Sequence, residues 1–241
     1  MFERPHHQRI AQVLRVLDGP LLRQNNCLFG GGTAIALRYG EYRESVDIDF
    51  LVSDVDSYRA LRQLLTGPNG IAAIVRDEAG PLTQTREVRA DQYGIRTMLR
   101  AEDQPIKFEI ILEGRIELAA AASSDEVCGI ATLTPLDMAT SKLLANSDGW
   151  ADDGVFNLDL IDLAMMEPSL ALLRQAVKKA EGAYGEAILR DMDRALDRLK
   201  NRHGWLERCM QAMAIDLPKA LVWQRLRALR RVFPSGGDER G

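Results

Sequence analysis

The sequence predicts an α+β fold, with a small mixed sheet flanked by helices and followed by an α-helical C-terminal region. Two observations carry this prediction. Apolar runs of strand type, bounded by polar and turn residues, occur before about residue 130, and the longest fall between residues 84 and 112. Beyond residue 130 the apolar residues recur at helical spacing. We therefore expect an α/β core over residues 1–130 and a helical region over residues 131–241.

Composition narrows the class of protein. Hydrophobic residues make up 46% of the 241 residues and charged residues 27%, as in soluble globular proteins. The three cysteines lie far apart, which argues against a zinc site or disulfide scaffold and favours a cytoplasmic location. The polar N-terminus has no signal-peptide core, and no apolar run reaches the ~18–20 residues that span a bilayer. No membrane contact is expected.

The first half of the chain should alternate between helices and strands. The spacing predicts a helix over 6–18, which Asp18-Gly19-Pro20 stops, and then a buried segment over 27–29. A helix over 33–39 and a strand over 46–52 should follow. The next elements are a helix over 57–65 capped by Asp54 or Asp56, a turn at 67–70 and a weaker strand over 71–75. Antiparallel strands follow over 93–100 and 106–112, joined by the turn 102–105.

The C-terminal region should be helical throughout. Thr134-Pro135 is a helix start, with proline at the first position. A polar loop is expected over 146–154. Further helices are expected over 155–166, 169–181, 184–203 and 217–232.

Two neighbouring patterns indicate chemistry. Gly30, Gly31 and Gly32 allow close approach of a ligand to the backbone, and Thr33 can cap the following helix, which suits a phosphate group. Asp47 and Asp49 alternate along a strand, so both carboxylates point to one face about 7 Å apart, which suits a divalent cation. An ordinary glycine-rich turn and a solvated polar edge strand are the alternative interpretations.

Together these residues resemble the opening motif of the AbiEii/AbiGii toxin group, within the DNA polymerase β-like nucleotidyltransferase superfamily. The matching residues are Gly31, Gly32, Thr33, Arg38, Arg43, Ser45, Asp47 and Asp49. The resemblance implies that Gly30–Thr33, Arg38 and Ser45 contact a nucleoside triphosphate. It also implies that Asp47 and Asp49 bind Mg²⁺ or Mn²⁺.

The resemblance extends to three later elements. Ile106–Ile110 matches the strand that carries a third acid, here Glu109, as a metal ligand or proton acceptor; a charge partner for Lys107 or Arg96 is the alternative. Lys142 matches a lysine that reaches the nucleotide phosphates and the departing pyrophosphate. Asp162, in the pattern Asp159-x-x-Asp162-Leu, matches an acid that holds the lysine. A lysine–aspartate salt bridge between two helices is the alternative for this set.

The resemblance implies a toxin that transfers a nucleoside monophosphate to RNA, such as a tRNA 3′ end, or to a protein hydroxyl. It also implies a toxin–antitoxin or abortive-infection system with a cognate antitoxin protein. A kinase-like phosphotransferase and a silent nucleotide-binding module remain open as alternatives. The histidines lie outside every motif, so none is assigned a catalytic role.

The charge distribution bears on the acceptor. The net charge is −4, but residues 190–232 carry 11 Lys and Arg against 5 Asp and Glu. The arginines at 190, 194 and 198 share one helix face, and those at 225, 227, 230 and 231 lie on another helix. These helices either follow an RNA backbone or form solvated faces with internal salt bridges.

Overall fold

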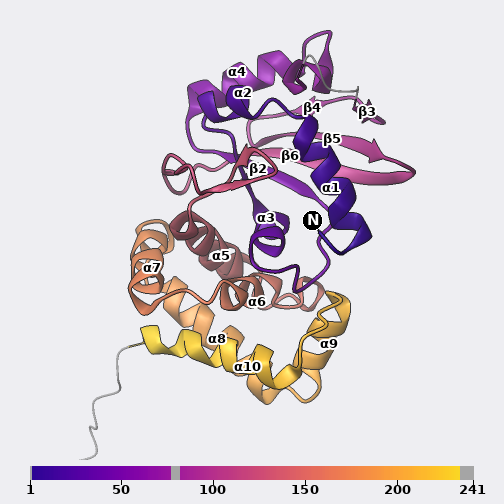
Figure 1. Ribbon diagram of the computed structural model, residues 1–241. Helices are drawn as coiled ribbons and strands as arrows, with labels where there is room; N and C mark the ends of the chain where they lie inside the picture. Colours follow the sequence, from indigo (N-terminus) through magenta and orange to yellow (C-terminus); the bar gives the residue numbers. More distant parts are fainter. Residues whose placement is uncertain (1, 77–81, 234–241) are drawn as a thin grey trace, which may run out of the picture. The chain divides into compact units, whose positions relative to one another are not determined.

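The structure, a computed structural model, describes residues 2–76 and 82–233. The chain divides into two compact units, Met1–Met138 and Ala139–Gly241. Strands and helices share the first unit, and helices make up the second (Figure 1). The α+β class predicted from the sequence is confirmed.

The first unit is built on one mixed sheet. Its helices are α1 (Pro5–Val16), α2 (Gly19–Gln24), α3 (Gly31–Arg38) and α4 (Val55–Leu65). Its strands are β1 (Leu28–Gly30), β2 (Ile48–Val52), β3 (Thr83–Gln84), β4 (Arg89–Ala90), β5 (Gly94–Ala101) and β6 (Gln104–Leu112), with β7 (Glu126–Val127) and β8 (Ile130–Ala131) in a separate pair. The strand order is β1-β2-β6-β5-β3, and β4 also pairs with β5. Only the β2–β6 pair is parallel among the described strands.

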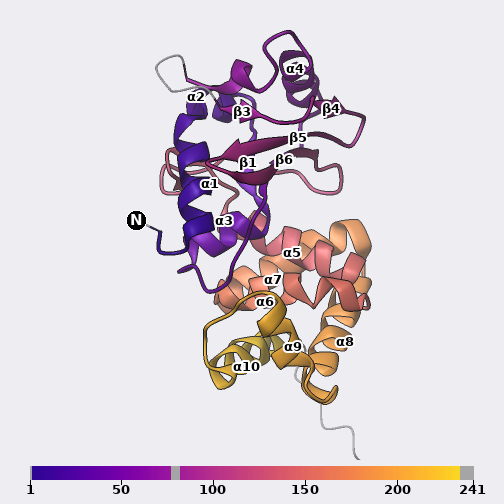
Figure 2. The same cartoon turned by 90° about the vertical axis from the view of Figure 1, so that its right-hand side faces the viewer.

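Alternation along the central strands separates a core face from a polar face. Phe29, Phe50 and Phe108 lie on the core face, where neighbouring ring centroids are 5.6 Å apart. Helix α1 lies beside this sheet in both views (Figures 1 and 2). Its buried residues recur at helical spacing. The residues of opposite parity, Asp49 on β2 and Glu109 on β6, therefore face away from the aromatic core.

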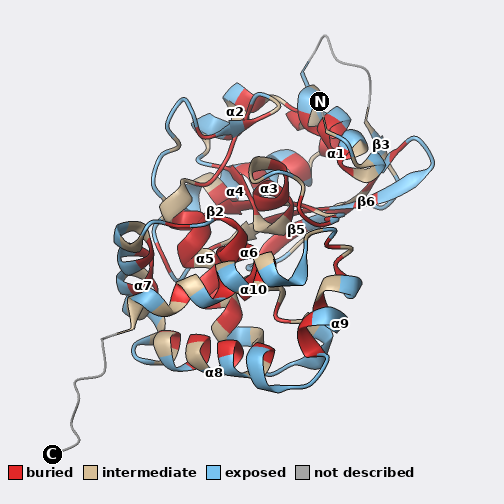
Figure 3. Cartoon of the chain, turned by 60° about the horizontal axis from the view of Figure 1, so that its bottom comes forward, coloured by how far each residue is buried: buried red, intermediate tan, exposed pale blue. Residues whose placement is uncertain are grey.

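The second unit consists of helices around a buried central helix. These are α5 (Pro135–Gly149, which starts in the first unit), α6 (Leu158–Met165), α7 (Leu170–Tyr184), α8 (Ala187–Asn201), α9 (Trp205–Ala212) and α10 (Lys219–Ala228). The short 3-10 helices η2 (Asp153–Val155) and η3 (Leu229–Val232) belong to the same unit. Residues 160–165 of α6 are all buried, whereas α8 alternates buried and exposed residues (Figure 3). Helix α10 packs on α6.

Several predicted elements differ from those observed. Residues 70–74 form the 3-10 helix η1 (Gly70–Ile74) rather than a strand, because the buried residues Ile71 and Ile74 are three apart. Helix α2 begins at Gly19, inside the predicted stop, because Asp18 caps it: the Asp18 carboxylate accepts a hydrogen bond from the Leu21 N–H. Helix α5 runs to Gly149 through part of the expected loop, and helix α9 was not predicted.

Other predictions hold. Helix α1 begins one residue before the predicted span 6–18 and ends two residues before the end of that span, the hairpin of β5 and β6 turns where expected, and Asp54 caps helix α4.

All three cysteines are free thiols. Among residues 2–76 and 82–233, no helix is both long enough and apolar enough to cross a membrane.

Candidate functional site

Two predicted acids occupy adjacent positions on the sheet. Asp49 pairs with Glu109 in the parallel register of β2 and β6, and Gly30 pairs with Asp49 in the register of β1 and β2. Arg96 on β5 lies opposite Glu109. Glu109 therefore stands on the strand beside the Asp-x-Asp strand, where the resemblance places a third acid. Asp47 comes one residue before β2 and, like Asp49, is partly exposed.

The glycine run packs directly against this acidic row. Gly31 has a φ of +65°, and a Cβ atom built on it would lie 2.5 Å from Asp49 Oδ2. Only glycine allows both this conformation and this close approach. The group that closely approaches Gly31 is the Asp49 carboxylate. The predicted approach of a ligand to the glycines stays a prediction.

One detail of the predicted phosphate loop is wrong. Thr33 does not cap helix α3, because α3 begins at Gly31 and Gly30 occupies the cap position without a side chain. The Thr33 hydroxyl instead lies 2.7 Å from the Ser45 hydroxyl, and both side chains are buried. The contact joins the first turn of α3 to the loop that leads into Asp47.

Lys107 belongs to this region, and the sequence prediction did not assign it a role at the site. Its Nζ lies 2.5 Å from Glu109 Oε2. The hydrogen bond to Glu109 raises the pKa of Lys107, burial opposes the rise, and the charges of Glu109, Asp47 and Asp49 add to it. The carboxylates on this face therefore already attract a cation. The alternation that puts Lys107 and Glu109 on one face was visible in the sequence.

The acidic side chains at this site are of the type that binds a divalent cation. Asp47 and Asp49 supply carboxylate oxygens, the ligands that Mg²⁺ prefers. Glu109 accepts from Arg96 Nε at 2.8 Å as well as from Lys107, so the charge-partner interpretation describes its present contacts. Within the described ranges, no three His, Cys, Asp or Glu side chains are grouped to hold a metal ion. Asp47 and Asp49 are thus the first candidates for ligands, and the role of Glu109 stays a prediction.

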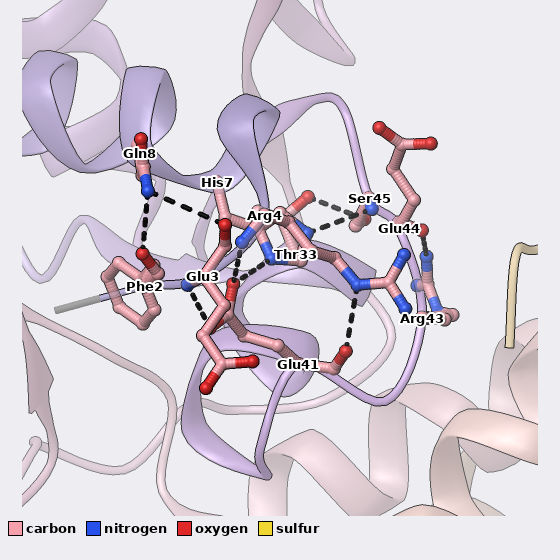
Figure 4. A network of polar contacts seen from close by, with 10 residues as sticks. All are labelled: Phe2, Glu3, Arg4, His7, Gln8, Thr33, Glu41, Arg43, Glu44 and Ser45. Carbon is pink, nitrogen blue, oxygen red and sulfur yellow. Dashed lines mark hydrogen bonds and ion pairs between the residues drawn. The ribbon is translucent and has the colours of Figure 1, made fainter. Parts of the chain in front are cut away.

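A buried histidine holds the loop that carries Ser45. His7 on α1 is fully buried; its Nδ1 lies 2.7 Å from Glu41 Oε1, and its Nε2 accepts a hydrogen bond from the Ser45 N–H at 3.1 Å (Figure 4). Since an amide N–H can only donate, Nε2 carries no proton and Nδ1 donates to Glu41. Glu41 also accepts from the N–H groups of Glu3 and Arg4. No local pattern marks His7, because its partners lie more than thirty residues away.

This contact makes the loop sensitive to pH. Burial lowers the pKa of His7 below 6.5, although the bond to Glu41 opposes the shift, and the charges of Arg4 and His6 add to it. The unfolded chain therefore takes up the proton first as the pH falls below 6.5, so acid destabilises the folded state. We expect the unfolding free energy to fall between pH 7 and pH 5, by at most about 1.4 kcal/mol per pH unit from this group. Urea titrations should show a shallower pH slope for His7→Gln; an unchanged slope would contradict this assignment.

Arg38 is engaged elsewhere in the first unit. Its guanidinium donates to Thr132 Oγ1 at 2.7 Å and to Asp125 Oδ1 at 3.1 Å. It thereby ties α3 to the segment around β7 and β8. Its predicted contact with the nucleotide remains a prediction.

The predicted lysine–aspartate set lies in the second unit. Lys142 Nζ is 2.8 Å from Asp159 Oδ1 and 2.8 Å from Asp162 Oδ2, and Asp162 is completely buried. The pair joins α5 to α6, as the salt-bridge interpretation expects. The ion pair between Lys142 and Asp162 is also compatible with the predicted role of Asp162, which is to hold the lysine. The predicted action of Lys142 on the nucleotide phosphates stays a prediction.

The basic C-terminal helices have many internal partners. Arg230 binds Asp193 and Asp197, Arg225 binds Glu167, and Arg202 binds Asp153. Arg198 and Arg202 lie over the ring of Trp205, with guanidinium carbons 4.9 and 4.2 Å from its centroid. These contacts favour the salt-bridge interpretation of this region over a surface built for RNA.

Comparison with known proteins identifies the family. The family model described as "Nucleotidyl transferase AbiEii toxin, Type IV TA system" matches residues 15–229. The chain belongs to the AbiEii family. No curated protein matches it. A "putative nucleotidyltransferase from H. pylori" is similar in structure, with 18% identity, a TM-score of 0.49 and coverage of 94% of this chain and 93% of that one. JHP933 from Helicobacter pylori is similar at 19% identity and a TM-score of 0.43, with 94% of each chain covered.

This AbiEii-family chain is therefore a nucleotidyltransferase, of a family described as the toxins of toxin–antitoxin systems. The family match spans most of both units. The family and enzyme class predicted from the Gly-Gly-Thr and Asp-x-Asp motifs are confirmed.

Proposed function

We propose that this AbiEii-family protein transfers a nucleoside monophosphate from a nucleoside triphosphate to a hydroxyl group of RNA, such as a tRNA 3′ end. The observation that supports this most is the row formed by Gly30, Asp49 and Glu109 on adjacent strands, with Gly31 packed against Asp49. A glycine-lined helix start beside paired acids combines an anion site with a cation site, and a triphosphate with its metal ion needs both.

The residues would divide the work as follows. The backbone N–H groups of Gly31 and Gly32 bind phosphate oxygens, and the Ser45 hydroxyl, placed by Thr33 and His7, assists them. Asp47 and Asp49 hold Mg²⁺ or Mn²⁺, and Glu109 either joins them or accepts the proton of the attacking hydroxyl. When bound, the metal ion stabilises negative charge on the reacting phosphate oxygens.

The reaction balances without another reactant. The acceptor oxygen forms a bond to the α-phosphorus of the triphosphate, the bond from that phosphorus to the bridging oxygen breaks, and pyrophosphate leaves with the electron pair. The acceptor hydroxyl loses one proton. Because the protein contributes positioning and electrostatics, its charged groups should control the rate more than its stability.

Label position in the triphosphate tests this function. The purified protein is incubated with tRNA and Mg²⁺, and with triphosphates labelled at either the α or the γ position. We expect the RNA to acquire the α label alone, and EDTA to abolish the transfer. Label from the γ position would instead establish the kinase-like alternative. Transfer from neither position, to RNA or to proteins of a cell lysate, would leave only a nucleotide-binding module.

The family match supports a proposal about the biological setting. A nucleotidyltransferase of this kind would modify its acceptor in the cytoplasm and would be restrained by a cognate antitoxin protein. The toxin activity should therefore appear as growth arrest when the protein is expressed without that partner.

A further inference from the structure

A basic cavity lies within the first unit. It has a volume of about 690 Å³ and is lined by Arg86, Glu87, Arg89, Arg96, Thr97, Met98 and Lys107. Four cationic side chains thus line it against one acidic side chain. Met98 and the alkyl stems of the basic residues give it an apolar part.

The cations differ in how far they are neutralised. Arg96 is paired with Asp91 and Glu109, and Lys107 with Glu109. Arg86 and Arg89 are exposed, and neither has an ion-pair partner among the described side chains. Two guanidinium groups that have no ion-pair partner within residues 2–76 and 82–233 thus lie at one cavity. They make a site for phosphate oxygens, which arginine binds with paired N–H donors.

The sheet register connects this cavity to the candidate site. Arg89 lies opposite Arg96, Arg96 opposite Glu109, Glu109 opposite Asp49, and Asp49 opposite Gly30. The row therefore has the glycine run at one end, the acids in the middle and the basic cavity at the other end. Strand β5 is two strands away from β2, roughly 10 Å.

This order matches what an in-line displacement needs. The attacking hydroxyl must approach the α-phosphorus from the side opposite to the departing pyrophosphate. With the triphosphate over the glycines, an acceptor held along this row would approach from the side of β6, β5 and β4. The carboxylates would repel an RNA strand there, so cations are needed to hold its phosphates.

We propose that the cavity at Arg86, Arg89, Arg96 and Lys107 binds the single-stranded end of the RNA acceptor. This inference rests on the proposed function and adds the place where the acceptor lies. The volume suits a nucleotide unit, the arginine planes can stack on an unpaired base, and the guanidinium groups of Arg86 and Arg89 bind the adjoining phosphates. A protein acceptor has no comparable need for clustered arginines.

Charge reversal at Arg86 and Arg89 tests the assignment. Both side chains are exposed, so Arg86→Glu/Arg89→Glu should fold normally. The matched control is Arg59→Glu/Arg62→Glu, which reverses two exposed arginines on α4 of the same unit. Binding of a single-stranded oligoribonucleotide and of tRNA is measured over a series of salt concentrations. Transfer kinetics are measured with the triphosphate and with the RNA as the varied substrate.

We expect the cavity variant to raise the KM for RNA by roughly 10- to 100-fold and to flatten the slope of log K against log salt by about 1.4, the value for two lost single-strand phosphate contacts. The KM for the triphosphate should change by less than about twofold, and the control should match the parent in every measurement. Unchanged RNA binding and KM in a parent protein that transfers nucleotide to RNA would overturn the inference. Transfer to protein alone would also overturn it.

The two proposals fail in different ways. If the parent transfers no nucleotide but its RNA binding is lost in the cavity variant, the proposed function is wrong while the cavity still binds RNA. If the parent transfers the α label to RNA and the cavity variant behaves like its control, only the cavity assignment is wrong.

Discussion

Asp49→Asn is expected to lower the rate of nucleotidyl transfer by about 10³-fold or more while leaving the fold intact. Asparagine has nearly the shape of aspartate, so the packing against Gly31 and the position beside Glu109 should persist. The negative charge that would hold a divalent cation is lost. Initial rates of α-label transfer and a thermal unfolding curve measure the two effects separately.

A second aspartate provides the matched control. Asp56 lies on α4 with its side chain 87% exposed, and its ion pair with Arg59 is worth little. Asp56→Asn should therefore transfer nucleotide at the parent rate. A folded Asp49→Asn protein with parent activity would show that the acidic row is not the metal site.

Gly31→Ala should damage both stability and activity. The φ of +65° costs an alanine about 1–2 kcal/mol. In addition, its Cβ would lie 2.5 Å from Asp49 Oδ2, so the carboxylate or the helix start has to move. We expect a total loss of about 2–3 kcal/mol in unfolding free energy. The displacement of Asp49 should reduce transfer further, by about 10-fold or more. Urea unfolding and steady-state kinetics measure these losses.

Gly40→Ala separates strain from the clash. Gly40 also has a positive φ, +86°, but an added Cβ would meet nothing within 4 Å. This variant should lose stability through backbone strain alone and keep its activity. If Gly31→Ala matched Gly40→Ala in both unfolding free energy and transfer rate, the close approach of Gly31 to Asp49 would not matter for activity.

Much of the central sheet and part of the candidate site could be predicted from the sequence. Alternation along residues 106–112 correctly placed Lys107 and Glu109 on one face. The apolar residues around the Asp-x-Asp pattern predicted a strand over 46–52, but β2 begins only at Ile48, so Asp47 lies just before the strand. Alternation cannot tell which strands become neighbours. The register of Asp49 with Glu109, and of Glu109 with Arg96, depends on contacts far apart in the chain, and only the structure supplies them.

The remaining misses have similar causes. His7 has no local motif, because its partners Glu41 and Ser45 come together only when α1 packs against the loop after α3. Thr33 was predicted as a cap from its position after glycines, but the helix starts earlier and its hydroxyl binds Ser45. For the C-terminal arginines, a charge count could not decide between RNA binding and internal salt bridges, because it does not show the acids that pair with them.

The stoichiometry of the reaction products tests the central claim most directly. The protein is incubated with tRNA, a nucleoside triphosphate and Mg²⁺. The released pyrophosphate is quantified, and the mass of the RNA is determined by mass spectrometry. We predict one pyrophosphate for each nucleoside monophosphate added to the RNA, and neither product with Asp49→Asn. Release of nucleoside diphosphate with a phosphorylated acceptor, or no change in either substrate, would contradict the account.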